Sequence, residues 1–312
     1  MNNRVYGIAG IGAKMSMWNA DMNLSAKRNS DGIIFGSDKA LKFAIKDLWQ
    51  KQGEKVLAIK HRDENYNLLN LKDIYKAEFG ADLTAKKDKE GNVKVLKNIL
   101  QCIDVVNFGV TFAVGDQNIG ITGAVQVGQG LNKWDAAEVE TIDILSPYVN
   151  SAKEDASMTS IGSKNVVNEA HYVYPFTINP SNYNYLKKIV EGFNGYTNED
   201  YLKLKENLLV CATALETNSK TGCENEFTIF VECKDESKLY LANLDSYINI
   251  DYSENNVNLR KLDITKLQNY LESKNSDISK IEVYYNPYKL ELVYNKETEN
   301  NLIVMNMFGD VL

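Results

Sequence analysis

The residues best placed to do chemistry are the basic side chains of the first 62 positions. This stretch holds eleven Lys/Arg and five Asp/Glu, a net charge of +6, whereas the whole chain carries −7, so residues 63–312 carry −13. Basic side chains concentrated in one block typically face a polyanion, and nucleic acid is the commonest. A solvated basic helix without a partner is the alternative that charge alone leaves open.

Other reactive side chains are sparse. Asp21 and Asp31 flank the basic pair Lys27-Arg28, and a carboxylate beside bound RNA can assist its cleavage. His61 and His171 lie far apart, and neither has ligand-like spacing to other residues. His171, beside Tyr172 and Tyr174, is expected to be an ordinary strand residue. We therefore predict no zinc site, no His-based triad, and no metal or cofactor.

The basic block reads as strand, loop, helix. An apolar run with glycines at residues 5–11 predicts a strand, and residues 17–32 predict a polar loop. A helix begins near Ser37-Asp38, either of which can cap it. Its apolar positions recur on one face, whereas three lysines recur on another, which predicts an inward-packed helix with an outward lysine stripe. The apolar residues are Leu41, Ile45, Leu48 and Trp49, and the stripe is Lys39, Lys42 and Lys46.

Further along, glycines are dense between Gly109 and Gly130. They are explained either by bulges and turns or by a backbone surface that an RNA strand can approach closely. A metabolic enzyme that binds a nucleotide through Gly120 to Gly130 is a further alternative. Later segments predict helices starting at 197 and near 263–273, with strands near 226–233, 239–250, 280–285, 289–294 and 302–308. The first of these helices has the inward residues Tyr201, Leu204, Leu208, Ala212 and Leu215.

Composition bounds the class of protein. The chain is 44% hydrophobic, enough for a proper core. Its four cysteines form no CxxC pair and read as reduced thiols of a cytoplasmic protein. The apolar run at 5–11 is too short to span a bilayer and lacks signal-peptide features, so we expect no membrane partner.

Three ordered segments resemble the opening of the repeated backbone subunit of type I CRISPR effector complexes, closest to the subtype I-B form. They are Trp18-Asn19-Ala20-Asp21, Lys27-Arg28-Asn29-Ser30-Asp31-Gly32 and Gly36-Ser37-Asp38-Lys39-Ala40-Leu41-Lys42. Later stretches fit in the family's order, namely 102–110 leading into 120–129, 158–164 before 172–174, and 214–222 before 227–231. Together these segments cover about half of the chain.

The mixed strands and helices, and the resemblance, imply an α+β fold with a ferredoxin-like RNA-recognition-motif core and long insertions. We expect a single domain over 1–312. Within it, residues 63–100 form a helical and loop insertion, 150–180 contain a protruding thumb hairpin, and 235–312 form a strand-rich C-terminal extension.

The resemblance implies a non-catalytic role in antiviral defence. Several copies polymerise along one CRISPR RNA and present it for pairing with target DNA. The other expected partners are the large subunit, the guide-handle-binding subunit and the small subunit, with a helicase-nuclease recruited later. Backbone subunits of the related type III complexes cut target RNA with an acidic loop residue, so cleavage through Asp21 or Asp31 remains an alternative.

Guide RNA held through its backbone requires cations, amides and glycines in a groove, with an apolar wedge that interrupts base stacking. The predicted RNA-binding residues are Asn19, Lys27, Arg28, Ser37, Lys39, Lys42, Lys46, Gln126, Lys164 and Lys220. Met158 and Ile161 are the wedge candidates, and burial in the protein's own core is the alternative for both.

Overall fold

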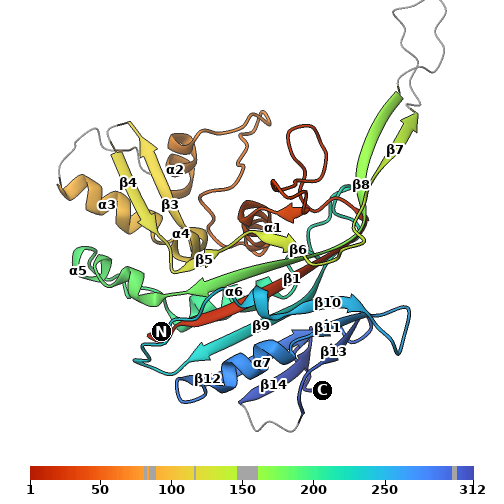
Figure 1. Cartoon of the computed structure of the whole chain (residues 1–312). Helices are drawn as coiled ribbons and strands as arrows, with labels where there is room; N and C mark the ends of the chain where they lie inside the picture. Colours follow the sequence, from red (N-terminus) through yellow and green to blue (C-terminus); the bar gives the residue numbers. More distant parts are fainter. Residues whose placement is uncertain (81–82, 84–88, 116, 146–160, 297–300) are drawn as a thin grey trace, which may run out of the picture.

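The computed structural model describes residues 1–80, 83, 89–115, 117–145, 161–296 and 301–312. In this part of the chain, nine strands form one mixed sheet whose main path is β14-β12-β9-β1-β8-β6-β2, with β5 and β7 pairing to β8 (Figure 1). The strands of this sheet are β1 (Val5–Ser16), β2 (Phe35–Gly36), β5 (Val125–Val127), β6 (Gly130–Asn132), β7 (Val139–Leu145), β8 (Ile161–Ile178), β9 (Cys223–Cys233), β12 (Ile278–Tyr285) and β14 (Leu302–Asn306).

Strand β1 is the centre of this sheet and is buried on both faces. Alternate residues enter different apolar clusters: Ala9 and Ile11 face one cluster, whereas Tyr6 and Ile8 face the other. Gly7 and Gly10 leave room for aromatic rings from neighbouring strands. A Cβ on Gly10 would lie 2.1 Å from the ring of Phe227, so this glycine serves packing and no bound ligand.

Two layers cover the sheet. Helices α1 (Asp38–Lys51) and α6 (Asn198–Leu208) contact each other on one face. On the other face, α7 (Thr265–Glu272) and a small sheet contribute to the second apolar cluster (Figure 1). The small sheet contains β10 (Asn249–Tyr252), β11 (Arg260–Asp263) and β13 (Leu290–Val293). The predicted α+β class is confirmed. Among the described residues, both faces of the sheet are covered along residues 5–13 of β1.

A separate group of elements between α1 and β5 packs into the cluster that α1 joins. It contains the 63–100 stretch together with a two-stranded hairpin. Its elements are α2 (Leu71–Phe79), α3 (Lys89–Ile99), α4 (Ile103–Phe108), β3 (Gly109–Val114) and β4 (Gln117–Thr122). The short helices η1 (Pro180–Tyr183) and α5 (Leu186–Ile189) follow β8, and η2 (Leu244–Tyr247) precedes β10.

A two-stranded arm projects from the body (Figure 1). Residues 139–145 of β7 pair with 161–167 of β8, whereas β1 in the main sheet pairs with β8 over residues 167–178. The first strand of the arm thus begins before the predicted 150–180 range. Strand β8 is therefore continuous from the main sheet into the arm.

Two predicted elements differ from those in the structure. Residues 239–250 were predicted to be a strand, but they contain η2, because Leu244 and Ile248 are buried four residues apart rather than in alternation. Helix α6 starts where predicted, with Thr197 and Asp200 forming a capping box, but it ends at Leu208. There the amide of Asn225 donates to Leu208 O (2.8 Å) and accepts from Ala212 N (2.8 Å), the two groups that the next helical turn would join.

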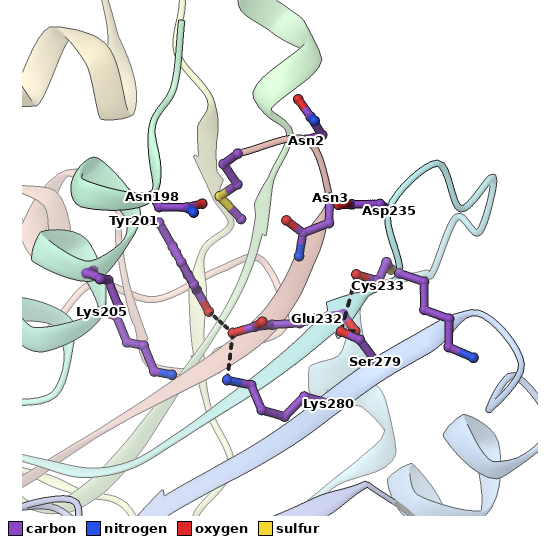
Figure 2. A pocket seen from close by; sticks show the side chains of 13 residues that line it. Asn2, Asn3, Asn198, Tyr201, Lys205, Glu232, Cys233, Asp235, Ser279 and Lys280 are labelled. Carbon is purple, nitrogen blue, oxygen red and sulfur yellow. Dashed lines mark hydrogen bonds and ion pairs between the residues drawn. The ribbon is translucent and has the colours of Figure 1, made fainter. Parts of the chain in front are cut away.

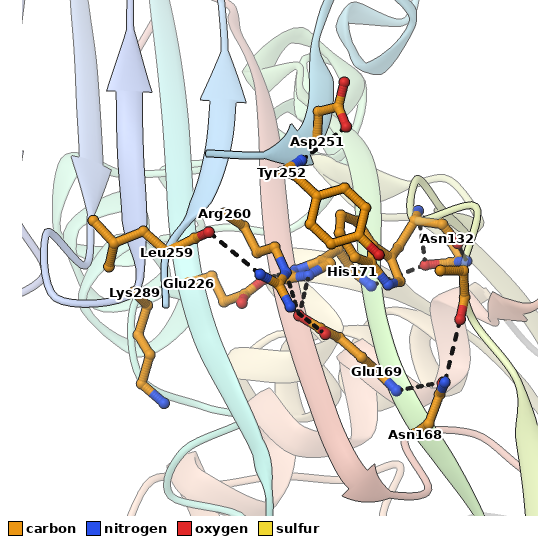
Figure 3. A network of polar contacts seen from close by, with 12 residues as sticks. Asn132, Asn168, Glu169, His171, Glu226, Asp251, Tyr252, Leu259, Arg260 and Lys289 are labelled. Carbon is orange, nitrogen blue, oxygen red and sulfur yellow. Dashed lines mark hydrogen bonds and ion pairs between the residues drawn. The ribbon is translucent and has the colours of Figure 1, made fainter. Parts of the chain in front are cut away.

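His171 lies in β8, as predicted for a strand residue, but it belongs to a buried charged network (Figure 3). Its Nδ1 lies 2.6 Å from Glu226 Oε2 on β9, and its Nε2 lies 3.3 Å from Glu169 Oε1. Arg260 of β11 donates to both oxygens of Glu169, at 2.8 and 2.7 Å, and lies over the ring of Trp134. The network therefore joins the small sheet to the base of the arm.

This network predicts alkaline destabilisation. Burial opposes the imidazolium, but the carboxylates of Glu226 and Glu169 outweigh it and raise the pKa of His171 from 6.5 to about 9. A raised pKa stabilises the fold fully below about pH 6.5, and this contribution is lost as the pH rises through about 9. Urea unfolding should show a loss on the order of 2 kcal/mol between pH 6 and pH 9.5 that His171→Gln lacks. Equal pH slopes for the two proteins would contradict the assignment.

Candidate nucleic-acid interface

The loop that follows β1 is held by buried hydrogen bonds to β8 and to the start of α1. The indole N–H of Trp18 donates to the hydroxyl of Tyr174 (2.6 Å), which donates in turn to Ser37 O (3.3 Å). The side-chain oxygen of Asn19 accepts from Ser37 N (2.8 Å). Asn19 and Ser37, predicted separately, therefore lie together. Ser37 occupies the N-cap position of α1, but its hydroxyl makes no capping bond.

Lys220 bonds to the backbone at the start of the same loop. Its ammonium donates to Met17 O (2.8 Å) and to Trp18 O, and it lies 5.7 Å from the ring of Trp18. Burial lowers the pKa of this lysine. The ammonium group of Lys220 therefore bonds to backbone carbonyl groups of this chain. These contacts indicate that Lys220 positions the basic loop.

Lys27 and Arg28 lie in the loop itself. Backbone bonds fix Lys27, whose N–H donates to Asn19 O (3.2 Å) and whose carbonyl accepts from Phe35 N (2.9 Å). Arg28 is exposed and donates to Gly32 O (2.7 Å). Within the described residues, no carboxylate forms an ion pair with Lys27, Arg28 or Lys39. These three cations therefore retain charge that a bound polyanion can neutralise.

The predicted lysine stripe of α1 is uneven. Lys39 is exposed, but Lys42 pairs with Asp38 at 2.9 Å, and only 19% of its side chain is exposed. Lys46 is 14% exposed, donates to Ala58 O (3.1 Å) and lies 3.6 Å from Asp104. The prediction that Lys46 faces outward is thus wrong. Helix α4 and the segment that follows α1 both pack along that side of α1. Burial lowers the pKa of Lys46 despite the opposing effect of Asp104.

Two more predicted contacts lie on other elements. Lys164, in the arm, donates to Asn218 at its side-chain oxygen (2.8 Å) and its carbonyl oxygen (3.2 Å). Gln126 is exposed in β5 and donates to Gly123 O (3.0 Å). Residues around the base of the arm also touch the basic loop, because Asn165 donates to Leu24 O (3.1 Å). Lys164 thus lies near the loop, whereas in the part of the chain that the structure describes the side chain of Gln126 bonds to Gly123 and not to the loop.

Sequence reasoning missed Gln129, which lies three residues after Gln126. Its side-chain amide donates to Asp38 Oδ1 (3.2 Å) and so links the segment before β6 to the first turn of α1. The sequence at 120–129 contains both Gln126 and Gln129, but it does not say which glutamine reaches the helix. Of the wedge candidates, Met158 lies outside the described residues. Ile161 begins β8, and its side chain is not described.

The carboxylates of the nuclease alternative differ in their surroundings. Asp21 Oδ1 accepts from Asn23 N (2.8 Å) and Ser25 N (3.0 Å), so it shapes its own loop. Asp31 is exposed beside Asn29. No group of three or more His, Cys, Asp or Glu side chains suited to a metal ion occurs within the described ranges. The four cysteines are free and buried.

The glycines of the nucleotide-binding alternative mostly face the protein itself. A Cβ on Gly123 would lie 2.3 Å from Asn107 O, and one on Gly130 would lie 2.4 Å from the ring of Tyr174. Gly120 is open, with nothing near its missing Cβ. At Gly123 and Gly130, close packing of chain on chain therefore accounts for the glycine.

A cavity of about 690 Å³ lies elsewhere, between the N-terminus, α6 and the ends of β9 and β12 (Figure 2). Several of its charged groups contact one another: the hydroxyl of Tyr201 donates to Glu232 (2.7 Å), and Lys280 lies 3.5 Å from the same carboxylate. Lys205 pairs with Glu282. Burial and Glu232 raise the pKa of Tyr201, which therefore stays protonated as a donor.

Fold and interface together describe an α+β protein with a projecting arm and unpaired cations in the loop at its base. A family model described as "CRISPR-associated protein Cas7" matches residues 3–297. The chain belongs to this family. No helix in the described part of the chain is both long and apolar enough to cross a bilayer.

A solved structure of low sequence identity shares the fold. A chain of a "CRISPR RNA-guided surveillance complex, pre-nicking" is 13% identical with a TM-score of 0.54, and the match covers 95% of this chain and 96% of that one. A chain of a "CRISPR RNA-guided surveillance complex" is 11% identical with a TM-score of 0.47, covering 95% and 91%. No curated protein matches the sequence.

Proposed function

We propose that this chain is a CRISPR RNA-binding backbone subunit that polymerises along the guide and presents it for pairing with target DNA. Membership of the Cas7 family is the observation that carries the proposal. The unpaired charges of Lys27, Arg28 and Lys39 support it, since guide phosphates require such cations. Lys42, Lys164, Ser37 and Gln126 are further candidate contacts, whereas Lys220, Lys46 and Asn19 act by shaping the loop and helix that carry the others.

We propose further that the core is ferredoxin-like. Strands β9, β1, β8 and β6 are neighbours in that order, and each adjacent pair is antiparallel. Helix α1 follows β1, helix α6 precedes β9, and the two helices contact each other. This is the chain order and strand order of a βαββαβ unit. The other elements are then insertions into this core and an extension after it.

In this assignment the β7–β8 arm is the thumb, with Met158 and Ile161 as the wedge between stacked bases. Its projection from the body supports the assignment (Figure 1). Further copies of the chain, the large, handle-binding and small subunits, and a later helicase-nuclease are the proposed partners of a cytoplasmic complex. Subtype I-B is the proposed type.

We propose that the chain binds RNA without cutting it. The carboxylate of Asp21 is engaged by two backbone N–H groups, which supports a structural role. Labelled complementary RNA, incubated with the guide-loaded protein and Mg²⁺ or Mn²⁺, should therefore remain intact. Metal-dependent cutting that Asp21→Ala or Asp31→Ala abolishes would instead favour a ribonuclease.

A further inference from the structure

Four loops of this protein share one construction: residues 21–25, 29–33, 63–67 and 306–310. Each begins with Asp or Asn, whose N–H donates to the carbonyl of the fifth residue at 2.7–3.0 Å. The side-chain oxygen of that first residue accepts from the N–H groups of the third and fifth residues. The flanking residues form a β-bridge in every case.

The fourth position of each loop is left-handed, which permits a comparison within one chain. Two loops place glycine there, Gly32 (φ +81°) and Gly309 (φ +91°), as the backbone favours. The other two place Leu24 (φ +62°) and Tyr66 (φ +66°), which are 70% and 75% exposed. A bulky side chain at this φ is strained. Because both side chains are exposed, burial of apolar surface does not offset the strain. Such an outlier points to a contact outside the chain.

Tyr66 is accompanied by a cation. Arg62 lies over its ring at 4.1 Å from the centroid and donates to Tyr66 O (2.7 Å). Arg28 makes the same bond to Gly32 O (2.7 Å), so the two loops position their arginines alike, and only the 63–67 loop adds a ring. Lys60 and Arg62 are exposed, whereas the Asp63 carboxylate accepts bonds from Asn65 and Asn67.

We propose that Tyr66 and Arg62 form a stacking contact for a base of single-stranded nucleic acid, with Arg62 and Lys60 near its phosphates. The proposal rests on the proposed function, because it assigns one more contact to the same bound strand. An exposed aromatic ring beside cations is the usual platform for an unpaired base. Arg62 lies over the ring, and the 75% exposure of Tyr66 leaves ring surface for a base. Six hydrogen bonds close the loop and hold the backbone of Tyr66 in place.

The test is Tyr66→Gly, which copies the natural residue of the 29–33 loop. We expect a higher thermal midpoint, because glycine relieves the left-handed strain, together with about 10-fold weaker binding of single-stranded RNA. Tyr66→Asn should behave like Tyr66→Gly, whereas Tyr66→Phe should bind like the wild type. Tyr288→Gly removes another exposed tyrosine (87%) and should leave affinity unchanged.

A 2-aminopurine base scanned along the RNA supplies a second readout. We expect quenching at one or more positions with the wild type and with Tyr66→Phe, and relief of that quenching with Tyr66→Gly. Unchanged affinity and quenching in Tyr66→Gly would overturn this inference while leaving the proposed function standing. Absence of RNA binding by the wild type would overturn both. Loss of self-association without RNA in Tyr66→Gly would assign the ring to a protein contact and also overturn it.

Discussion

Reversing three charges together, Lys27→Glu, Arg28→Glu and Lys39→Glu, is expected to weaken single-stranded RNA binding by roughly 100-fold or more at physiological salt. These cations have no carboxylate partner among the described residues, so each is available to a phosphate. Each lost phosphate contact should flatten the log–log dependence of affinity on salt by about 0.7, or about 2 for all three. Fluorescence anisotropy with an unstructured RNA at several salt concentrations measures both quantities.

The matched control reverses three exposed lysines far along the chain, Lys188→Glu, Lys238→Glu and Lys266→Glu. It changes the net charge by the same amount. It therefore separates the loss of direct phosphate contacts from the effect of the protein's overall electrostatic field on RNA affinity. We expect a small loss of affinity and little change in salt slope. Equal losses in the two triple variants would contradict a localised RNA-binding loop, and unchanged binding in the first would remove these residues from the interface.

The largest effect on stability is expected from Asp104→Ala, at about 3–5 kcal/mol of unfolding free energy. Asp104 is fully buried and accepts from Leu57 N (2.9 Å) and Ala58 N (2.8 Å). Its carboxylate also lies 3.6 Å from Lys46. The substitution leaves two N–H donors and a largely buried ammonium without their partner, which costs more than a neutral hydrogen bond. Chemical denaturation measures the loss.

Asp38→Ala is the control for Asp104→Ala, because it also removes a carboxylate that pairs with a lysine of α1. The Lys42–Asp38 pair is partly exposed, with side-chain exposures of 19% and 24%, so its loss should cost less than about 1 kcal/mol. Comparable costs for the two variants would show that Asp104 does not anchor the segment after α1.

Sequence periodicity predicted α1 well, because a helical repeat depends only on residues that are close in the sequence. The four predicted inward residues of this helix are buried or packed against the core, and the helix starts where capping residues were expected. The exposure of its lysines depends on what packs alongside. Lys46 is covered by Ala58 and Asp104, which lie 12 and 58 positions later in the chain and whose placement no periodicity encodes.

Long-range pairing also decided two further features that the sequence did not predict. His171 was predicted to be an ordinary strand residue because Glu226 and Arg260 are distant in sequence, although strand pairing brings all three together. Asn225 lies in β9, and its side-chain amide ends α6 by bonding to Leu208 O and Ala212 N. The shared loop construction did have a local signal: Arg28-Asn29 and Arg62-Asp63 both place an arginine directly before the residue that begins the loop.

The central claim, that several copies polymerise along one RNA, is tested most directly by native mass. The purified chain is mixed with unstructured single-stranded RNAs of increasing length, and the masses of the complexes are measured by native mass spectrometry. We expect the number of protein copies to rise in regular steps with RNA length, with at least two copies on the longer strands. A single copy at every length, or assemblies whose copy number is independent of RNA, would contradict the claim.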